Sequence, residues 1–170
     1  PGTISINVPG AVQQALLYWE GANQEAADFT PFMDIAVSGI SVTGESIGGN
    51  TQYSGGFVTV SYRADITSLV SSGDNNLVID GLDFTQVNDG AGVLVIFDDG
   101  LTSAIEIRDG SDYAFRSELP GGSLRITEPQ TFLFAPSPVD RTAALSLFFG
   151  AVAGTVSGAG TARPTTIEIS

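Results

Sequence analysis

Short stretches of alternating apolar and polar residues, about ten residues apart, dominate this chain of 170 residues. Alternation with a period of two places the apolar side chains on one face of an extended strand, because successive side chains point to opposite faces. The clearest examples are residues 3–8 and 57–62. Residues 35–37 and 40–42 flank Gly39, as the two strands of a tight hairpin would. The pattern therefore predicts many short strands joined by glycine-rich turns.

Shorter apolar runs predict further strands along the rest of the chain. Residues 15–19 are continuously apolar, which is typical of a strand that is covered on both faces. The other expected strands lie at residues 76–80, 92–97, 104–108, 123–127, 131–134, 142–149 and 166–169. Many short strands at this regular spacing favour a sandwich of two antiparallel sheets.

One segment changes to helical spacing. Ile66, Leu69 and Val70 follow an i, i+3, i+4 pattern, and Asp65 precedes them as a candidate N-cap. We expect one short helix near residues 65–71. The whole chain is then a single all-β domain, an antiparallel β-sandwich of jelly-roll type.

The residue types that the chain lacks exclude several kinds of chemistry. It contains no Lys, His or Cys, and its net charge is -13. Ser-His-Asp triads, Cys nucleophiles, Schiff-base lysines and Cys/His zinc sites all need one of these side chains. We therefore expect no enzyme, although a hydrolase that uses paired carboxylates stays open.

Nucleic acid and membranes are not expected partners. The six arginines are scattered, whereas binding to a polyanion or an anionic surface needs clustered basic residues. The longest apolar run, at residues 143–156, is too short to span a bilayer. The chain opens without a basic segment followed by an apolar core, so either the protein is cytosolic or a signal peptide has been removed. We expect the second case, with an extracellular or cell-surface location.

Acidic and amide side chains gather around one predicted hairpin. They are Asn88, Asp89, Asp98, Asp99, Asp109 and Asp112. If the strands at 93–97 and 104–108 pair, two of the aspartates occupy the turn and two lie at the far end. Their oxygens suit Ca²⁺, and Asp98, Asp99, Asp109 and Asp112 are its candidate ligands. However, the spacing fits no EF-hand loop, and Asp and Asn beside Gly also form ordinary turns.

Two adjacent aromatic residues offer another candidate site. Tyr18 and Trp19 alternate in direction along one strand, so at least one of them belongs to the core. We assign Trp19 to the core. The alternative is a platform on which a sugar ring stacks.

The N-terminal strand is the candidate for assembly. It consists of Thr3, Ile4, Ser5, Ile6, Asn7 and Val8, between Pro1-Gly2 and Pro9-Gly10. Such an isolated strand can pair within its own sandwich, for example beside residues 166–169. It can also leave and complete the sheet of a neighbouring copy, because an open sheet edge is a template for pairing. A head-to-tail contact that does not close produces a filament.

Four segments in this order carry a family resemblance. They read VPGAV and ALLYWEG within residues 8–21, YRADITSLV over 62–70, AGVLVIFDD over 91–99 and IEIRDGSD over 105–112. Together they resemble the β-sandwich domains of secreted bacterial and archaeal surface proteins. The resemblance implies an extracellular β-sandwich, often one module of a surface or matrix protein. It implies no established activity and no catalytic residues.

These observations predict an extracellular or cell-surface structural protein. We expect an acidic subunit that assembles with copies of itself, as a homo-oligomer or a filament, by exchange of the strand at residues 3–8. The alternative is an adhesion module that binds a glycan or another surface ligand, with or without Ca²⁺.

Overall fold

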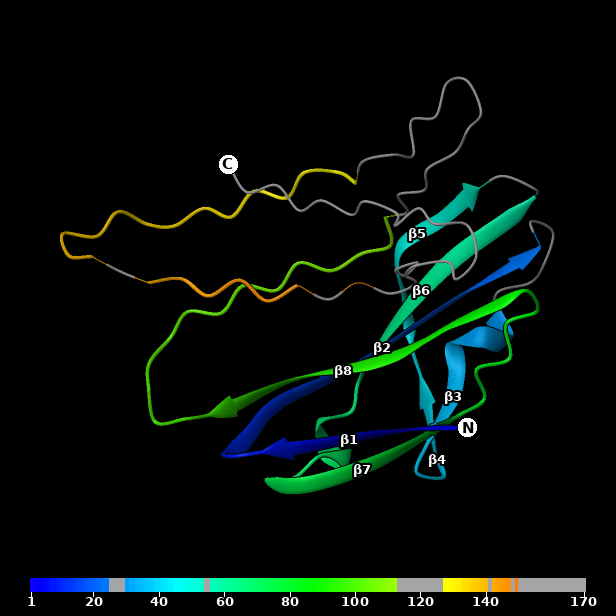
Figure 1. Cartoon of the computed structure of the whole chain (residues 1–170), viewed down its shortest axis with the longest axis horizontal. Coiled ribbons are helices and arrows are strands. Elements are labelled where there is room, and N and C mark those ends of the chain that lie inside the picture. Colours follow the sequence, from blue (N-terminus) through cyan, green and yellow to red (C-terminus); the bar gives the residue numbers. More distant parts are fainter. Residues whose placement is uncertain (25–29, 54–55, 113–126, 141, 148, 150–170) are drawn as a thin grey trace, which may run out of the picture.

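Two antiparallel sheets of four strands pack against each other in the computed structural model (Figure 1). The structure describes residues 1–24, 30–53, 56–112, 127–140, 142–147 and 149. The first sheet has the order β1 (Gly2–Val8), β7 (Gly73–Asp80), β3 (Asp34–Val37) and β4 (Ile40–Thr43). The second has the order β5 (Glu45–Tyr53), β6 (Phe57–Asp65), β2 (Ala11–Gln24) and β8 (Val87–Asp98). This arrangement confirms the predicted all-β sandwich.

Local sequence explains the tight hairpin between β3 and β4. Ser38 and Gly39 both have positive φ angles, of 51° and 81°. A two-residue turn of this kind matches the right-handed twist of the strands, and it needs a residue such as glycine that adopts positive φ without strain. The predicted strands at 35–37 and 40–42 and the turn at Gly39 are confirmed.

The core lies between the sheets and is centred on β2. Ala15, Leu17 and Trp19 alternate along β2 and are almost completely buried, because this face of β2 meets the first sheet. The Trp19 ring stacks on Tyr62 of β6, with the ring centroids 5.6 Å apart. Tyr62 in turn stacks on Phe84 at 6.4 Å. The assignment of Trp19 to the core is confirmed.

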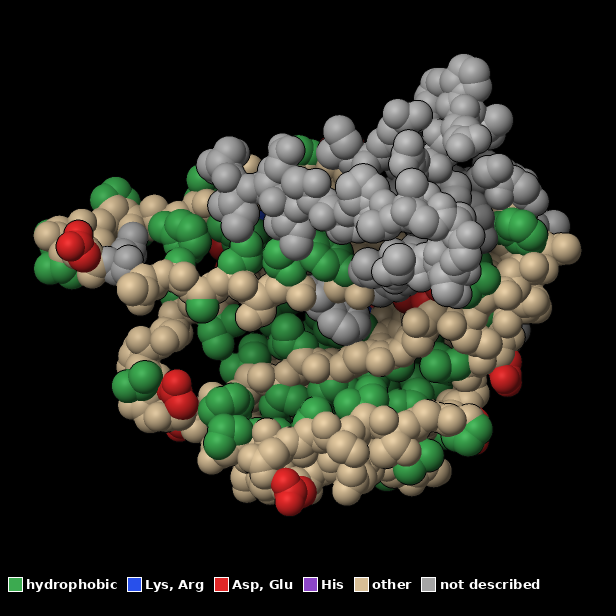
Figure 2. Space-filling model, viewed as in Figure 1, with side chains coloured by type: hydrophobic (Ala, Val, Ile, Leu, Met, Phe, Trp, Pro, Cys, Tyr) green, Lys and Arg blue, Asp and Glu red, His purple; other side chains and the backbone are tan. Residues whose placement is uncertain are grey.

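The surface view shows how the layers are covered (Figure 2). Hydrophobic side chains fill the space between the sheets, and some are visible as a seam between β8 and the layer of β1 and β7. Acidic side chains lie around the periphery of this face. Among the described residues, no helix is long and apolar enough to cross a membrane.

The strand at 104–108 and its hairpin with residues 93–97, both predicted near the acidic residues, are not present in the structure. Residues 104–108 form no strand, and β8 pairs with β2 rather than with them. The hairpin of 93–97 with 104–108 was therefore wrong. Instead, the segment 101–112, which we call the strap, turns back over the second sheet, as contacts of Asp109 described below show.

The strands predicted in the C-terminal part of the chain are also not present among the described residues. Residues 131–134 and 142–147 are described but form no strand. The predicted strand at 166–169 lies outside the described residues, as do residues 123–126 of the strand predicted at 123–127.

Conversely, the strand β5 was not predicted, because its glycines at 48 and 49 are typical of a loop. There the ladder with β6 is interrupted between Ile47 and Thr51, so the glycines form an irregularity within a strand.

The predicted helix is a single turn of 3-10 helix, η2 (Thr67–Leu69). Asp65 accepts a hydrogen bond from the Thr67 backbone N–H at 2.9 Å, as expected of a side chain at a helix start. However, the cap position itself is occupied by Ile66. The hydrogen bonds with Thr67 lower the pKa of Asp65. A second 3-10 turn, η1 (Thr30–Met33), precedes β3.

Candidate functional site

The candidate assembly strand, β1, is an edge strand of the first sheet. It pairs with β7 over its whole length, from Gly2 opposite Ile79 to Val8 opposite Gly73. No described strand pairs with its other edge. Two side-chain hydrogen bonds hold this register: the Ser5 hydroxyl donates to Asn76 at 2.7 Å, and the Asn7 amide donates to Asp74 at 2.6 Å.

One face of β1 contributes to the core. Val8 is buried, and Ile4 and Ile6 are half-buried against the core cluster. After β1 the chain passes through Pro9 and Gly10. Pro9 has no N–H and cannot continue a ladder, and a side chain at Gly10 would collide with the Asp98 carbonyl oxygen, 1.9 Å from an ideal Cβ. The crossing from β1 to β2 is thus short and specific to glycine.

Asp98 and Asp99 make turns at the end of β8. The Asp98 carboxylate accepts the Gly100 N–H at 2.8 Å, and the Asp99 carboxylate accepts the Leu101 N–H at 2.9 Å. Both are hydrogen bonds from an Asp side chain to the backbone two residues on, which stabilise a turn. These contacts match the turn interpretation of the sequence.

Asp109 and Asp112 lie elsewhere. Asp112 accepts the backbone N–H of Glu128, whereas Asp109 contacts the second sheet. Within the described part of the chain, no group of three or more Asp and Glu side chains could hold a metal ion. The calcium site therefore gains no support from the structure.

Asp109 joins the strap to the outer face of the second sheet. Its carboxylate accepts hydrogen bonds from the Tyr18 hydroxyl at 2.8 Å and from the Arg63 guanidinium at 2.7 Å. Arg63 also pairs with Glu45 of β5. Tyr18 of β2 and Arg63 of β6 are register partners in the ladder, so their side chains share one face. The two carboxylates raise the pKa of Arg63.

Sequence reasoning did not find this cluster, although part of its signal was present. Tyr18 and Arg63 alternate with Trp19 and Tyr62, so burial of the latter pair turns the former pair outward. The missing information was the position of Asp109, which depends on the return path of the strap.

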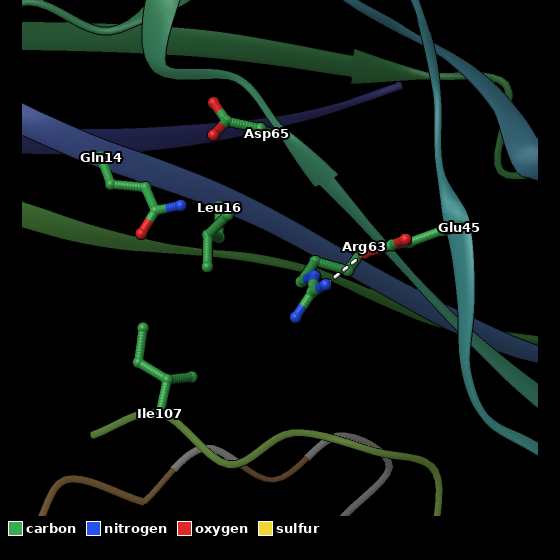
Figure 3. Close-up of a pocket in the computed structure, with 6 residues that line it drawn as sticks. All are labelled: Gln14, Leu16, Glu45, Arg63, Asp65 and Ile107. Carbon is green, nitrogen blue, oxygen red and sulfur yellow. Dashed lines mark hydrogen bonds and ion pairs between the residues drawn. The ribbon is translucent and has the colours of Figure 1, made fainter.

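A cavity of about 310 Å³ lies beside this cluster, between β2, β6 and the strap (Figure 3). Its lining consists of Gln14, Leu16, Glu45, Arg63, Asp65 and Ile107. The Arg63 guanidinium is already paired with Glu45 and Asp109 and is not free to bind an anion. With one paired cation and two apolar side chains, the cavity defines no ligand class.

The Tyr18 contact predicts a measurable pH dependence. Burial, followed by the hydrogen bond to Asp109, raises the pKa of Tyr18 from 10.0 to about 12. The folded state then holds the phenol proton more tightly than the unfolded chain. This contribution to stability is complete below about pH 10 and is lost as the pH rises through about 12.

Replacing Asp109 with asparagine is expected to lower the pKa of Tyr18 towards 10, since the carboxylate charge is removed while burial remains. Near-ultraviolet titration of each protein, with the matching Tyr18→Phe titration subtracted, isolates this phenol. Asp99→Asn is the control and should leave the pKa unchanged. An unchanged pKa in Asp109→Asn would contradict the observed contact.

Two carboxylates lie near each other elsewhere on the second sheet. Burial raises the pKa of Glu20, and the nearby charge of Asp89 adds to this increase, while a hydrogen bond from Ser61 at 3.1 Å opposes it. Burial also raises the pKa of Asp89. Asp89 is inserted opposite the step from Glu20 to Gly21, where the ladder of β2 and β8 shifts register. The pair thus arises from a β-bulge.

Comparison of the chain with known protein families, with characterised proteins and with solved structures found no match.

Proposed function

We propose that this protein is an extracellular or cell-surface structural subunit that assembles with copies of itself by exchange of β1. In the assembled form, β1 of one copy leaves its own sheet and pairs with β7 of the next copy. The observation that carries this proposal is that β1, a strand of seven residues, lies at the edge of its sheet and has β7 as its one ladder partner among the described strands.

Exchange conserves the contacts that β1 makes within one chain. The Ser5–Asn76 and Asn7–Asp74 hydrogen bonds and the burial of Val8 form identically between two copies. Swapping an identical element is for this reason a low-cost route to association. The register contacts also fix one pairing, because a shift by one residue would turn Ile4 and Ile6 away from the core.

The connection between β1 and β2, formed by Pro9 and Gly10, suits such an exchange. Proline ends the strand, so β1 and the long central strand β2 are separate units joined by two residues. Short hinge connections of this kind are associated with domain swapping. Each subunit offers one strand and one vacated edge, and head-to-tail repetition of this contact gives a filament.

Extracellular placement is part of the same proposal. Its support is the resemblance of the motifs in residues 8–112 to secreted surface domains, together with the acidic composition of the chain and its lack of Lys.

Deletion of residues 1–9 tests the proposal. We expect the shortened protein to lose its assembly, because the exchanged strand is absent, as judged by light scattering and electron microscopy. A synthetic peptide of residues 1–9 should bind the vacant edge of β7 and raise the melting temperature without restoring assembly. A peptide in which Ile4 and Ile6 are replaced by aspartate is the control and should not bind.

Assembly that survives the deletion unchanged would refute strand exchange. Failure of the native peptide to stabilise the shortened protein would show that β1 does not act as a separable strand.

A further inference from the structure

The strap is attached to the second sheet near its far end. Residues 101–106 are all exposed, and Ile107 is the first residue of the strap that is half-buried. Two residues further on, the Asp109 carboxylate accepts the hydrogen bonds from Tyr18 and Arg63. Figure 1 shows the strap in light green, leaving the end of β8 and returning towards β5. The first half of the strap is therefore exposed to solvent, and the contacts that fix it come later.

The space beneath the strap is incompletely filled. Leu16 of β2 and Ile107 of the strap line the same cavity of about 310 Å³, and Ile107 points towards the sheet face that carries Leu16 (Figure 3). Apolar side chains separated by a cavity lose dispersion contacts that a filled interior provides. Segments with few buried apolar contacts open at a lower free energy than the whole domain unfolds. Apolar packing therefore contributes little to the attachment of the strap.

Charge supplies the attachment instead. Arg63 is the one basic side chain in the lining of the cavity, and it joins Glu45 of β5 to Asp109 of the strap. Without this cation, the two carboxylates would face each other with like charge, which is unfavourable. The side chains of Arg63 and Asp109 are 31% and 22% exposed, so dissolved salt partly screens their attraction. The strength of the attachment thus depends on ionic strength.

We propose that the strap is a salt-sensitive latch, which opens and closes over the outer face of the second sheet while the sandwich stays folded. Arg63 and Asp109 hold it closed. Gly100, with a φ angle of 77°, lies where the strap leaves β8 and offers a hinge, because residues at element ends absorb the φ and ψ changes of such motions. Opening gives solutes access to Leu16 and the cavity. The latch uses no residue of β1 and is independent of strand exchange.

A cysteine at position 16 reports opening, because the chain contains no Cys of its own. Leu16 lies on the outer face of the sheet but is only 6% exposed, whereas its neighbour Leu17 is 0% exposed in the core. The rate at which Leu16→Cys reacts with iodoacetamide, relative to a free thiol, gives the free energy of opening. We expect this to be well below the free energy of unfolding of the same variant in urea. Leu17→Cys is the matched control and should react only through global unfolding.

Two results with these variants would overturn the proposal. If opening and unfolding of Leu16→Cys have equal free energies, the strap leaves the sheet only when the sandwich unfolds. If Leu16→Cys reacts as fast as a free thiol, the strap does not cover this face.

Removal of the latch carboxylate should speed the reaction. In the Leu16→Cys chain, Asp109→Ala is expected to raise the rate about tenfold, the usual effect of losing a hydrogen bond to a charged group. Asp112→Ala is the control, because Asp112 is also on the strap but accepts the backbone N–H of Glu128. It should leave the rate unchanged.

Salt should act through the same contact. An increase from about 0.1 M to about 1 M shortens the Debye length from about 10 Å to about 3 Å. It should speed the reaction of Leu16→Cys and have little effect once Asp109→Ala is added. A rate that responds neither to salt nor to Asp109→Ala would refute the ionic latch.

A steric substitution tests the closed position from the side of the sheet. An ideal Cβ on Gly48 would lie 1.9 Å from the Ser111 nitrogen of the strap, whereas one on Gly49 would meet nothing within 4 Å. The two φ angles are 71° and 75°, so alanine strains the backbone similarly at both positions. Gly48→Ala should therefore speed the reaction of Leu16→Cys more than Gly49→Ala does. Equal effects would show that the strap does not close against β5, and would overturn the proposal.

Discussion

Replacement of Trp19 by alanine is expected to lower the free energy of unfolding by about 3–5 kcal/mol, as for other large aromatic residues removed from cores. Trp19 is 1% exposed and stacks on Tyr62. Its indole N–H donates to the Phe32 carbonyl at 2.9 Å, which ties the turn before β3 to the core. Its ring also fills the space left by Gly44, where an ideal Cβ would lie 2.3 Å from the ring. Alanine would lose all of these contacts and leave a cavity.

A loss of this size is a large part of the stability of an ordinary domain, about 5–15 kcal/mol. Unfolding in urea, followed by circular dichroism, measures it. Tyr18→Phe is the matched control, because Tyr18 is the next residue on the same strand but faces outward. It should cost about 1 kcal/mol, the usual contribution of one hydrogen bond. Equal losses from the two substitutions would mean that the faces of β2 are wrongly assigned.

The contrast between these neighbours shows what the sequence can predict about this fold. Strands with strict alternation or a tight glycine turn, such as β1, β3, β4 and β6, were located correctly because their local pattern determines which face is buried. The long strand β2 was recognised by its continuous apolar run. Its outer face is indeed half covered, since Tyr18 contacts the strap through Asp109.

The failures have a common physical cause. Residues 104–108 and 142–147 have strand-like alternation, but forming a strand needs a partner edge, and pairing is set by the path of the whole chain. The strap instead crosses the second sheet at Gly48, where an ideal Cβ would lie 1.9 Å from the Ser111 nitrogen. The same glycine concealed β5. A position that is glycine because another segment passes over it cannot be distinguished from a loop glycine by local pattern alone.

The candidate sites also fall into two groups: those that local sequence predicts and those that depend on contacts between distant segments. The location of the candidate assembly strand depended on local signals, namely alternation and flanking prolines, and β1 is a strand over residues 2–8. The acidic residues depended on which distant segments meet. Asp98 and Asp99 make local turns, which their neighbours Gly100 and Leu101 suffice to explain. The Tyr18–Arg63–Asp109 cluster joins three separate segments and could be found only from the fold.

A disulfide between β1 and β7 is expected to distinguish exchange from simple pairing in one experiment. Ser5 and Asn76 are register partners whose side chains are in contact, and cross-strand partners have Cβ atoms close enough for a disulfide. In the Ser5→Cys/Asn76→Cys variant every disulfide must involve the introduced cysteines, because the native chain has none.

The order of assembly and oxidation decides the product. Oxidation before assembly should join β1 to β7 of the same chain, and this protein should no longer exchange. Oxidation after assembly should join β1 of each copy to β7 of the next, which a non-reducing denaturing gel reveals as a ladder of covalent oligomers. The Ser5→Cys single variant can form only dimers and is the control. If the assembled double variant yields only covalent monomers, β1 stays in its own sheet. A ladder requires that the strand has moved, since a contact between intact sandwiches cannot bring the cysteine introduced in β1 of one chain to the cysteine introduced in β7 of another in this register.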